Sequence, residues 1–87
     1  MRAIWRYPLD ILPEQTFRAP YLANVLAVRM EDGRYPTLYM LVDPTSPDVD
    51  KVIVMRRPGE EVEEARDVYI GEIEIETGIY FFFERFQ

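Results

Sequence analysis

The stretch NVLAVRMEDGRYPTLYMLV, residues 24–42, decides the fold because two largely apolar runs flank an Asp-Gly pair. Apolar and polar side chains alternate in these runs, which is typical of a strand with one buried face. Asp32-Gly33 is a strong hairpin signal, since both central residues of a type I′ turn need positive φ. The stretch therefore predicts a β-hairpin in which Met30 faces Tyr35.

The same period-two pattern recurs along the rest of the chain, and clusters of Pro, Gly and Asp separate the runs. The runs predict strands over 2–7, 15–18, 24–31, 34–42, 51–57, 69–75 and 79–86. The acidic run near 60–67 predicts either one short helix or a solvated loop, because Glu and Ala favour helices. We therefore expect a single domain, 1–87, with an all-β fold: a compact antiparallel sandwich or partly open barrel of six to seven strands.

The final stretch, GEIEIETGIYFFFERF at residues 71–86, predicts a second hairpin whose register has two solutions. A two-residue loop at 77–78 places Glu74 opposite Phe81 and mixes charge with rings on one face. A three-residue loop at 76–78, with its Gly in a bulge, places Ile73 opposite Phe81. We prefer this second register, because a buried face fixes register strongly. Its core face holds Ile73, Ile75, Ile79, Phe81 and Phe83, and its outer face holds Glu72, Glu74, Tyr80 and Phe82.

The preferred register leaves two aromatic rings among carboxylates on the outer face. Either a loop or the acidic segment folds over them, or they form a partner surface, since exposed apolar patches mark interaction sites. A C-terminal strand that presents rings suits a twofold dimer interface. We therefore predict a homodimer whose interface consists of Tyr80, Phe82, Glu72, Glu74 and Phe86.

The composition argues against several classes of enzyme and site. The chain has no Cys and no His, which excludes disulfides, thiolate zinc sites and nucleophiles activated by His. We expect no enzymatic activity, no catalytic residue, no cofactor and no metal. No apolar run has the length of a signal peptide or a membrane span, so we expect a cytoplasmic protein without membrane contact.

Acidic charge is concentrated in one segment of this chain, whose net charge is −6. Eight of its 16 acidic residues lie between residues 60 and 76, where Arg66 is the single base. The segment is either a solvated face that keeps the domain soluble or a surface whose carboxylates stand in for phosphates toward a nucleic-acid-binding partner. The sign of the charge disfavours direct binding of nucleic acid. The candidate acidic partner surface comprises Glu60, Glu61, Glu63, Glu64 and Asp67.

Arginines near aromatic residues offer a different kind of contact. Guanidinium groups bind phosphate and carboxylate in a bidentate geometry, and aromatic rings stack on bases. Arg56, Arg57 and Arg6 are therefore candidates for contact with an anion or a nucleotide. The alternative is a set of exposed arginines around a buried Trp5, because alternation places Arg6 on the face opposite Trp5.

Several short motifs occur in a characteristic order: IWRYPLDI, Gln15-Thr16, Pro20, LYMLVDP and YIGE. Together they resemble a family of small, uncharacterised proteins encoded in bacteriophages and prophages, over most of the chain. Those relatives carry a Gly- and His-containing stretch where this chain has RRPGEEVEEARD, and their ends are less aromatic than YFFFERF. The resemblance implies a phage origin and action in the cytoplasm of a bacterial host. It carries over no catalytic residue.

These observations lead to one functional expectation and two alternatives. We expect a non-enzymatic, phage-type accessory protein that binds or inhibits a host protein, such as a defence protein, and acts as a homodimer. The first alternative is a sponge for a small molecule or nucleotide. The second is a minor structural component of the virion.

Overall fold

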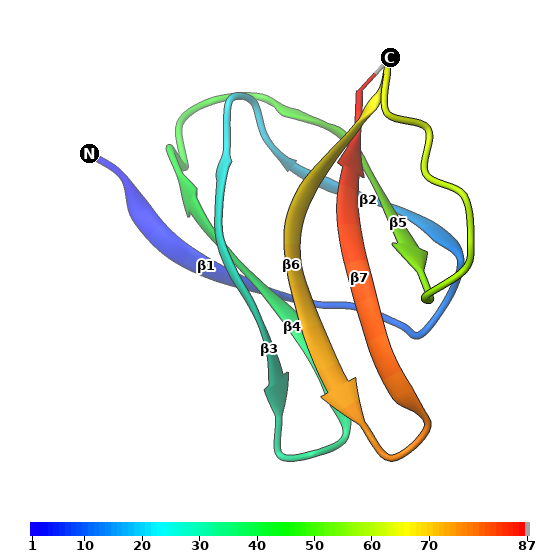
Figure 1. The fold of residues 1–87 in the computed structure, drawn as a ribbon. Coiled ribbons are helices and arrows are strands. Elements are labelled where there is room, and N and C mark those ends of the chain that lie inside the picture. Colours follow the sequence, from blue (N-terminus) through cyan, green and yellow to red (C-terminus); the bar gives the residue numbers. More distant parts are fainter. Residues whose placement is uncertain (87) are drawn as a thin grey trace.

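The structure, a computed structural model, describes residues 1–86 and consists of seven strands in two antiparallel sheets (Figure 1). The strands are β1 (Ala3–Pro8), β2 (Glu14–Pro20), β3 (Asn24–Glu31), β4 (Tyr35–Val42), β5 (Asp48–Arg56), β6 (Asp67–Ile75) and β7 (Gly78–Arg85). A three-stranded sheet has the order β1-β4-β3, and a four-stranded sheet has the order β2-β5-β7-β6. The predicted all-β class and all seven predicted strands are confirmed.

The two sheets meet along their edge strands β3 and β6, which lie side by side (Figure 1). At the closest point the backbone of Gly71 in β6 packs against Val28 in β3. At the opposite edges the rings of Tyr7 in β1 and Phe17 in β2 lie 5.0 Å apart. The sheets therefore enclose the core without a continuous hydrogen-bonded wall, as a partly open barrel does.

One apolar core fills the space between the sheets. Alternate residues of β4 point inward from the three-stranded sheet, and residues of β5 and β7 meet them from the four-stranded sheet. The largest fully buried side chains include Phe82, Leu38, Met40, Ile53 and Val28. Full burial of one such side chain stabilises a fold by about 1.5–3 kcal/mol. The shared core thus joins both sheets into one unit.

The first hairpin has the predicted turn backbone, but its register differs by one residue near the turn. Both residues of the Asp-Gly pair have positive φ, 52° and 64°. The loop holds three residues, so Met30 pairs with Pro36 and not with Tyr35. A β-bulge at Leu26 returns the ladder to the predicted register toward the start of β3. Such a bulge adds one unpaired residue, which a simple alternation pattern does not reveal.

The predicted register of the second hairpin is wrong, and the correction exchanges the two faces of β7. Ile73 pairs with Tyr80 and not with Phe81, because the loop between the ladders holds two residues, 76 and 77. Tyr80 and Phe82 therefore point into the core, with exposed fractions of 6% and 0%, while Phe81 and Phe83 are partly buried. Rings occupy both faces of β7, so its own pattern does not select a register. The Ile/Glu alternation of β6 fixes the buried face of β6 but fits either set of rings, so the two-residue loop sets the register.

The acidic run between β5 and β6 is a loop, so the alternative of a short helix near 60–67 is wrong. Residues 64–66 form a turn, closed by a hydrogen bond of 2.9 Å from the backbone N of Arg66 to the O of Glu63. Pro58-Gly59 precedes the run, and Gly59 has a φ of 95°. The few residues left before β6 are too short a stretch to nucleate a stable helix.

Candidate binding cleft

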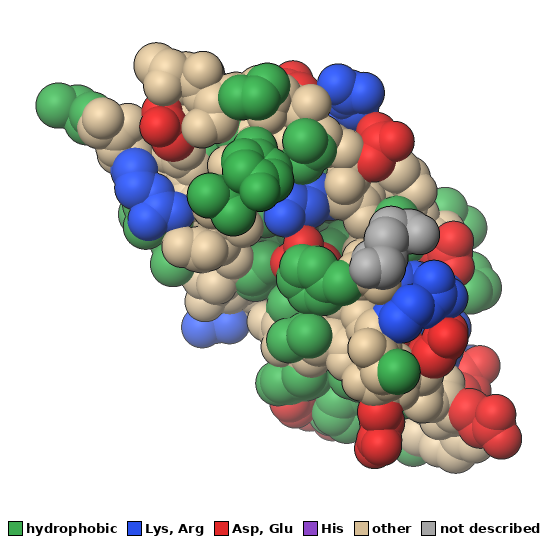
Figure 2. All heavy atoms as spheres, turned by 90° about the horizontal axis from the view of Figure 1, so that it is seen from above, with side chains coloured by type: hydrophobic (Ala, Val, Ile, Leu, Met, Phe, Trp, Pro, Cys, Tyr) green, Lys and Arg blue, Asp and Glu red, His purple; other side chains and the backbone are tan. Residues whose placement is uncertain are grey.

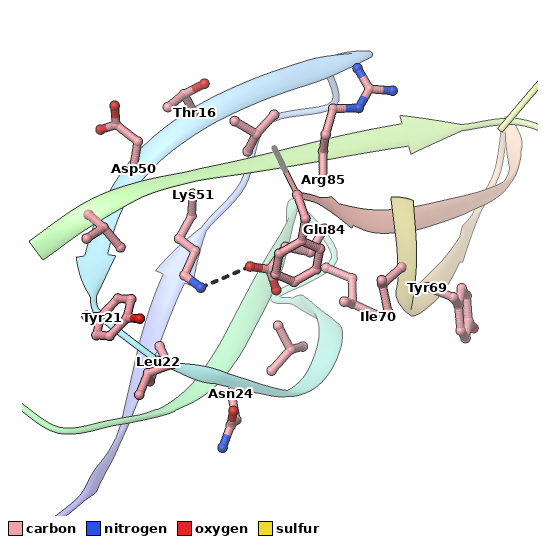
Figure 3. Close-up of a pocket in the computed structure, with 16 residues that line it drawn as sticks. Thr16, Tyr21, Leu22, Asn24, Asp50, Lys51, Tyr69, Ile70, Glu84 and Arg85 are labelled. Carbon is pink, nitrogen blue, oxygen red and sulfur yellow. Dashed lines mark hydrogen bonds and ion pairs between the residues drawn. The ribbon is translucent and has the colours of Figure 1, made fainter. Parts of the chain in front are cut away.

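A cleft of about 890 Å³, drawn close up in Figure 3, opens between the two sheets. It lies at the end of the molecule where Figure 1 shows both termini. The turn between β2 and β3 forms one side, and the start of β6 forms the other. Between these sides Lys51 of β5 and Glu84 of β7 point toward one another (Figure 3). The cleft therefore combines walls from both sheets with a charged pair at its floor.

The cleft opens because β3 and β6 separate beyond the contact between Val28 and Gly71. Each strand contains a β-bulge next to this contact, at Leu26 in β3 and at Ile70 in β6. A bulge bends its strand and increases its twist. The two edge strands diverge toward the end with the termini (Figure 1), and within residues 1–86 neither has a strand partner on its cleft side.

Large apolar side chains stay exposed around the cleft. We call this set the apolar rim; it consists of Tyr21, Leu22, Val68, Tyr69 and Phe86. Their exposed fractions run from 49% to 68%. Figure 2 shows this end of the molecule, where hydrophobic side chains gather in groups with charged side chains between them. Clusters of exposed apolar side chains of this kind mark interaction surfaces.

Leu22 adopts a strained backbone conformation at the rim. Its φ is 61°, in the left-handed region that leucine rarely occupies. A hydrogen bond of 3.2 Å from Ala23 N to Pro20 O closes the turn, and a bond of 2.9 Å from Tyr21 N to Pro47 O anchors it. The conformation costs about 1–2 kcal/mol in a residue with a Cβ. The turn thus holds an apolar side chain in solvent beside the cleft at the expense of stability, as functional sites often do.

The floor of the cleft holds an ion pair that is largely shielded from water. Lys51 Nζ lies 2.9 Å from Glu84 Oε2, and the two side chains are 12% and 9% exposed. Removing two charges from water costs several kcal/mol for each ion, and their attraction repays this only with good geometry. A small domain gains little stability from such a pair compared with apolar packing. The pair is therefore a candidate for recognition, since it offers both signs of charge to an occupant.

Arg85 fixes the wall of the cleft behind this pair. Its guanidinium donates to both carboxylate oxygens of Asp67, at 2.8 and 3.0 Å, and to Glu14 at 3.0 Å. The hydrogen bonds from Arg85 lower the pKa of Asp67, and the same bonds raise the pKa of Arg85. These contacts join β7 to β6 and β2. The start of β6, which carries two of the five residues of the apolar rim, is thereby held in place.

The structure separates the residues of the predicted interface. Tyr80 and Phe82 are core residues, so their expected place on an outer face is wrong. Glu72 and Glu74 are exposed on β6, and Glu72 accepts a hydrogen bond from the hydroxyl of Tyr69, which raises the pKa of Tyr69. Of the predicted set, Phe86 lies at the cleft.

The acidic surface is smaller than the sequence predicts. Glu60, Glu61, Glu63 and Glu64 are exposed, as expected. Asp67 is not part of that surface, because its side chain is fully buried against Arg85. The pKa of Glu63 is lowered by hydrogen bonds from Arg66, which compensates part of the charge.

The three candidate arginines do not converge on one site. Arg56 donates to the backbone oxygens of Glu61, Pro13 and Met55, at 3.1, 3.0 and 2.9 Å. Arg57 donates to Thr77 O at 3.0 Å, and its guanidinium lies 5.2 Å from the centre of the Tyr80 ring. Both side chains therefore brace loops. Arg6 lies on the other sheet, in β1, and is exposed.

Sequence reasoning missed most of the cleft, including its charged floor. Lys51 and Glu84 are 33 positions apart, and the cleft sides come from segments on different sheets. A weak signal for the floor exists: Lys51 is the single lysine and precedes the apolar run VIVM, while Glu84 follows four aromatic residues. A charge attached to a buried strand needs a partner.

Residues 1–86 contain no group of three or more side chains suited to holding a metal ion. Over the same residues, no helix has the length and apolar character that crossing a membrane requires.

Comparison with known proteins identifies a family for this chain. Residues 1–87 match the model of a family described as a domain of unknown function (DUF7352). No curated protein and no solved structure matches the chain. The family match agrees with the resemblance to an uncharacterised family and covers every residue. The chain therefore belongs to the DUF7352 family.

Proposed function

We propose that this protein is a non-enzymatic binding protein, and that its partner is a protein that places an extended, mainly apolar segment in the cleft. The observation that carries the proposal is the apolar rim around an open cleft between two diverging edge strands. An exposed apolar cluster promotes aggregation unless a partner covers it, so a cluster of this kind is typical of a binding surface.

The backbone around the cleft supports an extended partner. The cleft-side edges of β3 and β6 carry backbone N–H and C=O groups that no strand of residues 1–86 pairs. Exposed edges of this kind accept an added strand, whose main chain supplies affinity and whose alternate side chains supply specificity. One face of such a strand would meet the apolar rim, and the other would face solvent.

The charged groups of the cleft support binding rather than catalysis. Lys51 is paired with Glu84, and Arg85 is paired with Asp67. A general acid or base needs a group that is free to exchange a proton with a substrate. Paired charges in the cleft suit the selection of a partner. A partner that brings a charge without a matching group in the cleft would bind less tightly.

The resemblance to phage-encoded proteins extends this proposal to the partner's source. The partner is then a cytoplasmic protein of the bacterial host, such as a defence protein that the accessory protein inhibits. The acidic residues Glu60, Glu61 and Glu64 lie in the loop before β6 and provide a negatively charged flank. Such a flank increases the rate of association with a basic partner and is screened by salt.

A selection from displayed random peptides tests the proposal. We expect peptides with alternating apolar residues to be enriched on the native protein and to lose most of their binding to Leu22→Ser. The matched control is Ile11→Ser, which removes another exposed apolar side chain in a loop outside the cleft. Equal loss of binding in both variants, or no enrichment above background, would reject the cleft as the binding site.

The homodimer remains a prediction in this fold. It cannot use Tyr80 and Phe82, which are buried, so a dimer would need another surface, such as an edge strand. Light scattering of the purified protein at micromolar concentration measures the oligomeric state directly. A mass near 20 kDa, about twice the 10.3 kDa of the chain, would support the dimer, and a mass near 10.3 kDa would reject it.

A further inference from the structure

The outer face of the three-stranded sheet holds a second, separate pocket. Its volume is about 240 Å³, and it is lined by Arg6, Pro8, Glu31, Tyr35 and Thr37. The strand register explains why these residues meet: Pro8 pairs with Thr37, and Tyr35 pairs with Glu31. Residues two apart on a strand share a face, so Arg6 lies beside Pro8 on the same surface. The pocket thus spans all three strands.

Thr37 gives this pocket an unmet hydrogen bond. The residue is 2% exposed, and its Oγ1 has no hydrogen-bond partner among residues 1–86. A hydroxyl group that is buried without a partner is rare, and leaving it unsatisfied costs about 1–3 kcal/mol. Thr37 also lines the pocket, so a rotation of its side chain that turns the hydroxyl outward would let an occupant there supply the missing partner.

Two opposite charges line the pocket without neutralising each other. Within the described residues Arg6 forms no ion pair, although Glu31 lines the same pocket. Glu31 Oε1 accepts a hydrogen bond from the hydroxyl of Tyr39, which leaves its second oxygen for another donor. The pocket therefore offers a guanidinium, a carboxylate oxygen and a hydroxyl group, and it selects a ligand that carries both acceptors and donors.

The surroundings favour an anionic ligand with a flat ring. Arg29 pairs with Thr37 across the ladder and adds a second positive charge to this face of an acidic protein. The ring of Tyr35 is 41% exposed at the pocket and can stack on a base. A phosphate group suits a face with two arginines, because a guanidinium can contact phosphate through two N–H groups.

We propose that this pocket binds a guanine mononucleotide. The base lies against Tyr35, its N1–H and N2–H groups donate to the Glu31 carboxylate oxygen that Tyr39 does not bind, and its O6 accepts the hydrogen bond of the Thr37 hydroxyl. The phosphate lies toward Arg6. Adenine presents an acceptor where guanine presents the N1–H donor, so it would place a lone pair against the Glu31 carboxylate. This site is independent of the cleft between the sheets and goes beyond the proposed protein partner.

Isothermal titration calorimetry with guanosine monophosphate, adenosine monophosphate and inorganic phosphate tests this inference. We expect guanosine monophosphate to bind at least about tenfold more tightly than adenosine monophosphate, since one unmatched hydrogen-bonding group changes affinity by at least that factor. Inorganic phosphate should bind more weakly than either nucleotide. No heat of binding with guanosine monophosphate at millimolar concentration would overturn the inference, and so would equal affinity for all three probes, which indicates an anion site at arginine only.

Three variants locate the contact. Thr37→Val keeps the shape of the side chain and removes the hydroxyl, and Glu31→Gln keeps the size and removes the charge. We expect each to weaken binding of guanosine monophosphate about tenfold, and Glu31→Gln to reduce the preference over adenosine monophosphate. Arg6 is exposed, so Arg6→Gln retains the fold and should weaken both nucleotides. Arg18→Gln on β2 is the matched control, and loss of binding in this variant equal to that in Arg6→Gln would overturn the assignment.

Discussion

Gly71 lies so close to Val28 that a Cβ atom on Gly71 would be 3.0 Å from Val28 Cγ2 and 3.1 Å from Val28 Cβ. This contact joins the edge strands of the two sheets, where no ladder of hydrogen bonds connects them. It also lies next to both bulges, so the cleft begins where the contact ends. Both the packing of the two sheets and the opening of the cleft therefore depend on this contact.

Gly71→Ala should destabilise the protein strongly. The methyl group would crowd Val28, which would have to shift, and Gly71 has a φ of 154°, which residues with a Cβ rarely adopt. Overpacking and backbone strain together predict a loss of about 2–4 kcal/mol in the free energy of unfolding. Urea denaturation followed by tryptophan fluorescence measures it. Gly33→Asn is the control, since Asn tolerates the φ of 64° at that turn and should cost less than about 1 kcal/mol. Equal stability of the two variants would contradict the close contact.

The register of β7 predicts unequal effects for neighbouring phenylalanines. Phe82→Ala removes a fully buried ring and should cost about 3–5 kcal/mol, whereas Phe81→Ala removes a partly exposed ring and should cost clearly less. Thermal unfolding monitored by circular dichroism compares them. A larger loss of stability in Phe81→Ala than in Phe82→Ala would instead support the register that places Phe81 in the core.

The pair of Arg85 and Asp67 predicts a loss of stability in acid. Hydrogen bonds from Arg85 hold the pKa of Asp67 below its ordinary value of about 3.8, so the folded state binds this proton less readily than the unfolded chain. The stabilising contribution is complete above the ordinary value and is lost as the pH falls through the folded-state value. The difference in unfolding free energy between the native protein and Asp67→Asn should therefore be largest near neutral pH and shrink below about pH 4. A difference that is constant from pH 7 to pH 2 would refute this role.

Replacing the ion pair at the floor of the cleft by apolar residues should preserve stability but weaken the binding of a peptide. Lys51→Met leaves the Glu84 carboxylate shielded and unpaired, and it should cost about 3–5 kcal/mol. The double variant Lys51→Met with Glu84→Met replaces both charges by apolar groups and should recover most of that loss. The double variant should nevertheless bind a peptide selected on the native protein about tenfold or more weakly than the native protein does. Recovery of both stability and binding would show that the pair has no part in recognition.

The sequence predicts much of this fold because its strands carry strong local signals. Alternating residues and Pro, Gly and Asp clusters locate all seven strands, and the Asp-Gly pair locates a turn with positive φ. Near the turns, both predicted hairpin registers differ from the observed ones by one residue. The bulges and the two ring-bearing faces of β7 hide the register, since alternation is then satisfied in more than one way.

The cleft is harder to predict, because it depends on the placement of segments far apart in the sequence. The apolar rim combines the turn at 21–22 with the start of β6 and with Phe86. Their separation follows from two bulges and one close contact between sheets. The sequence does mark Leu22 and Tyr69 as apolar residues, but it cannot distinguish an exposed one from a buried one without the tertiary fold.

The most direct test of the central claim is a titration of the isotope-labelled protein with a selected peptide, followed by two-dimensional NMR of the backbone amides. Binding in the cleft should give large chemical-shift changes confined to the cleft, at Leu22, Asn24 and residues 68–70, and small changes along β1 and at the two hairpin turns. Changes centred on another surface, with the amides of the cleft unaffected, would contradict it.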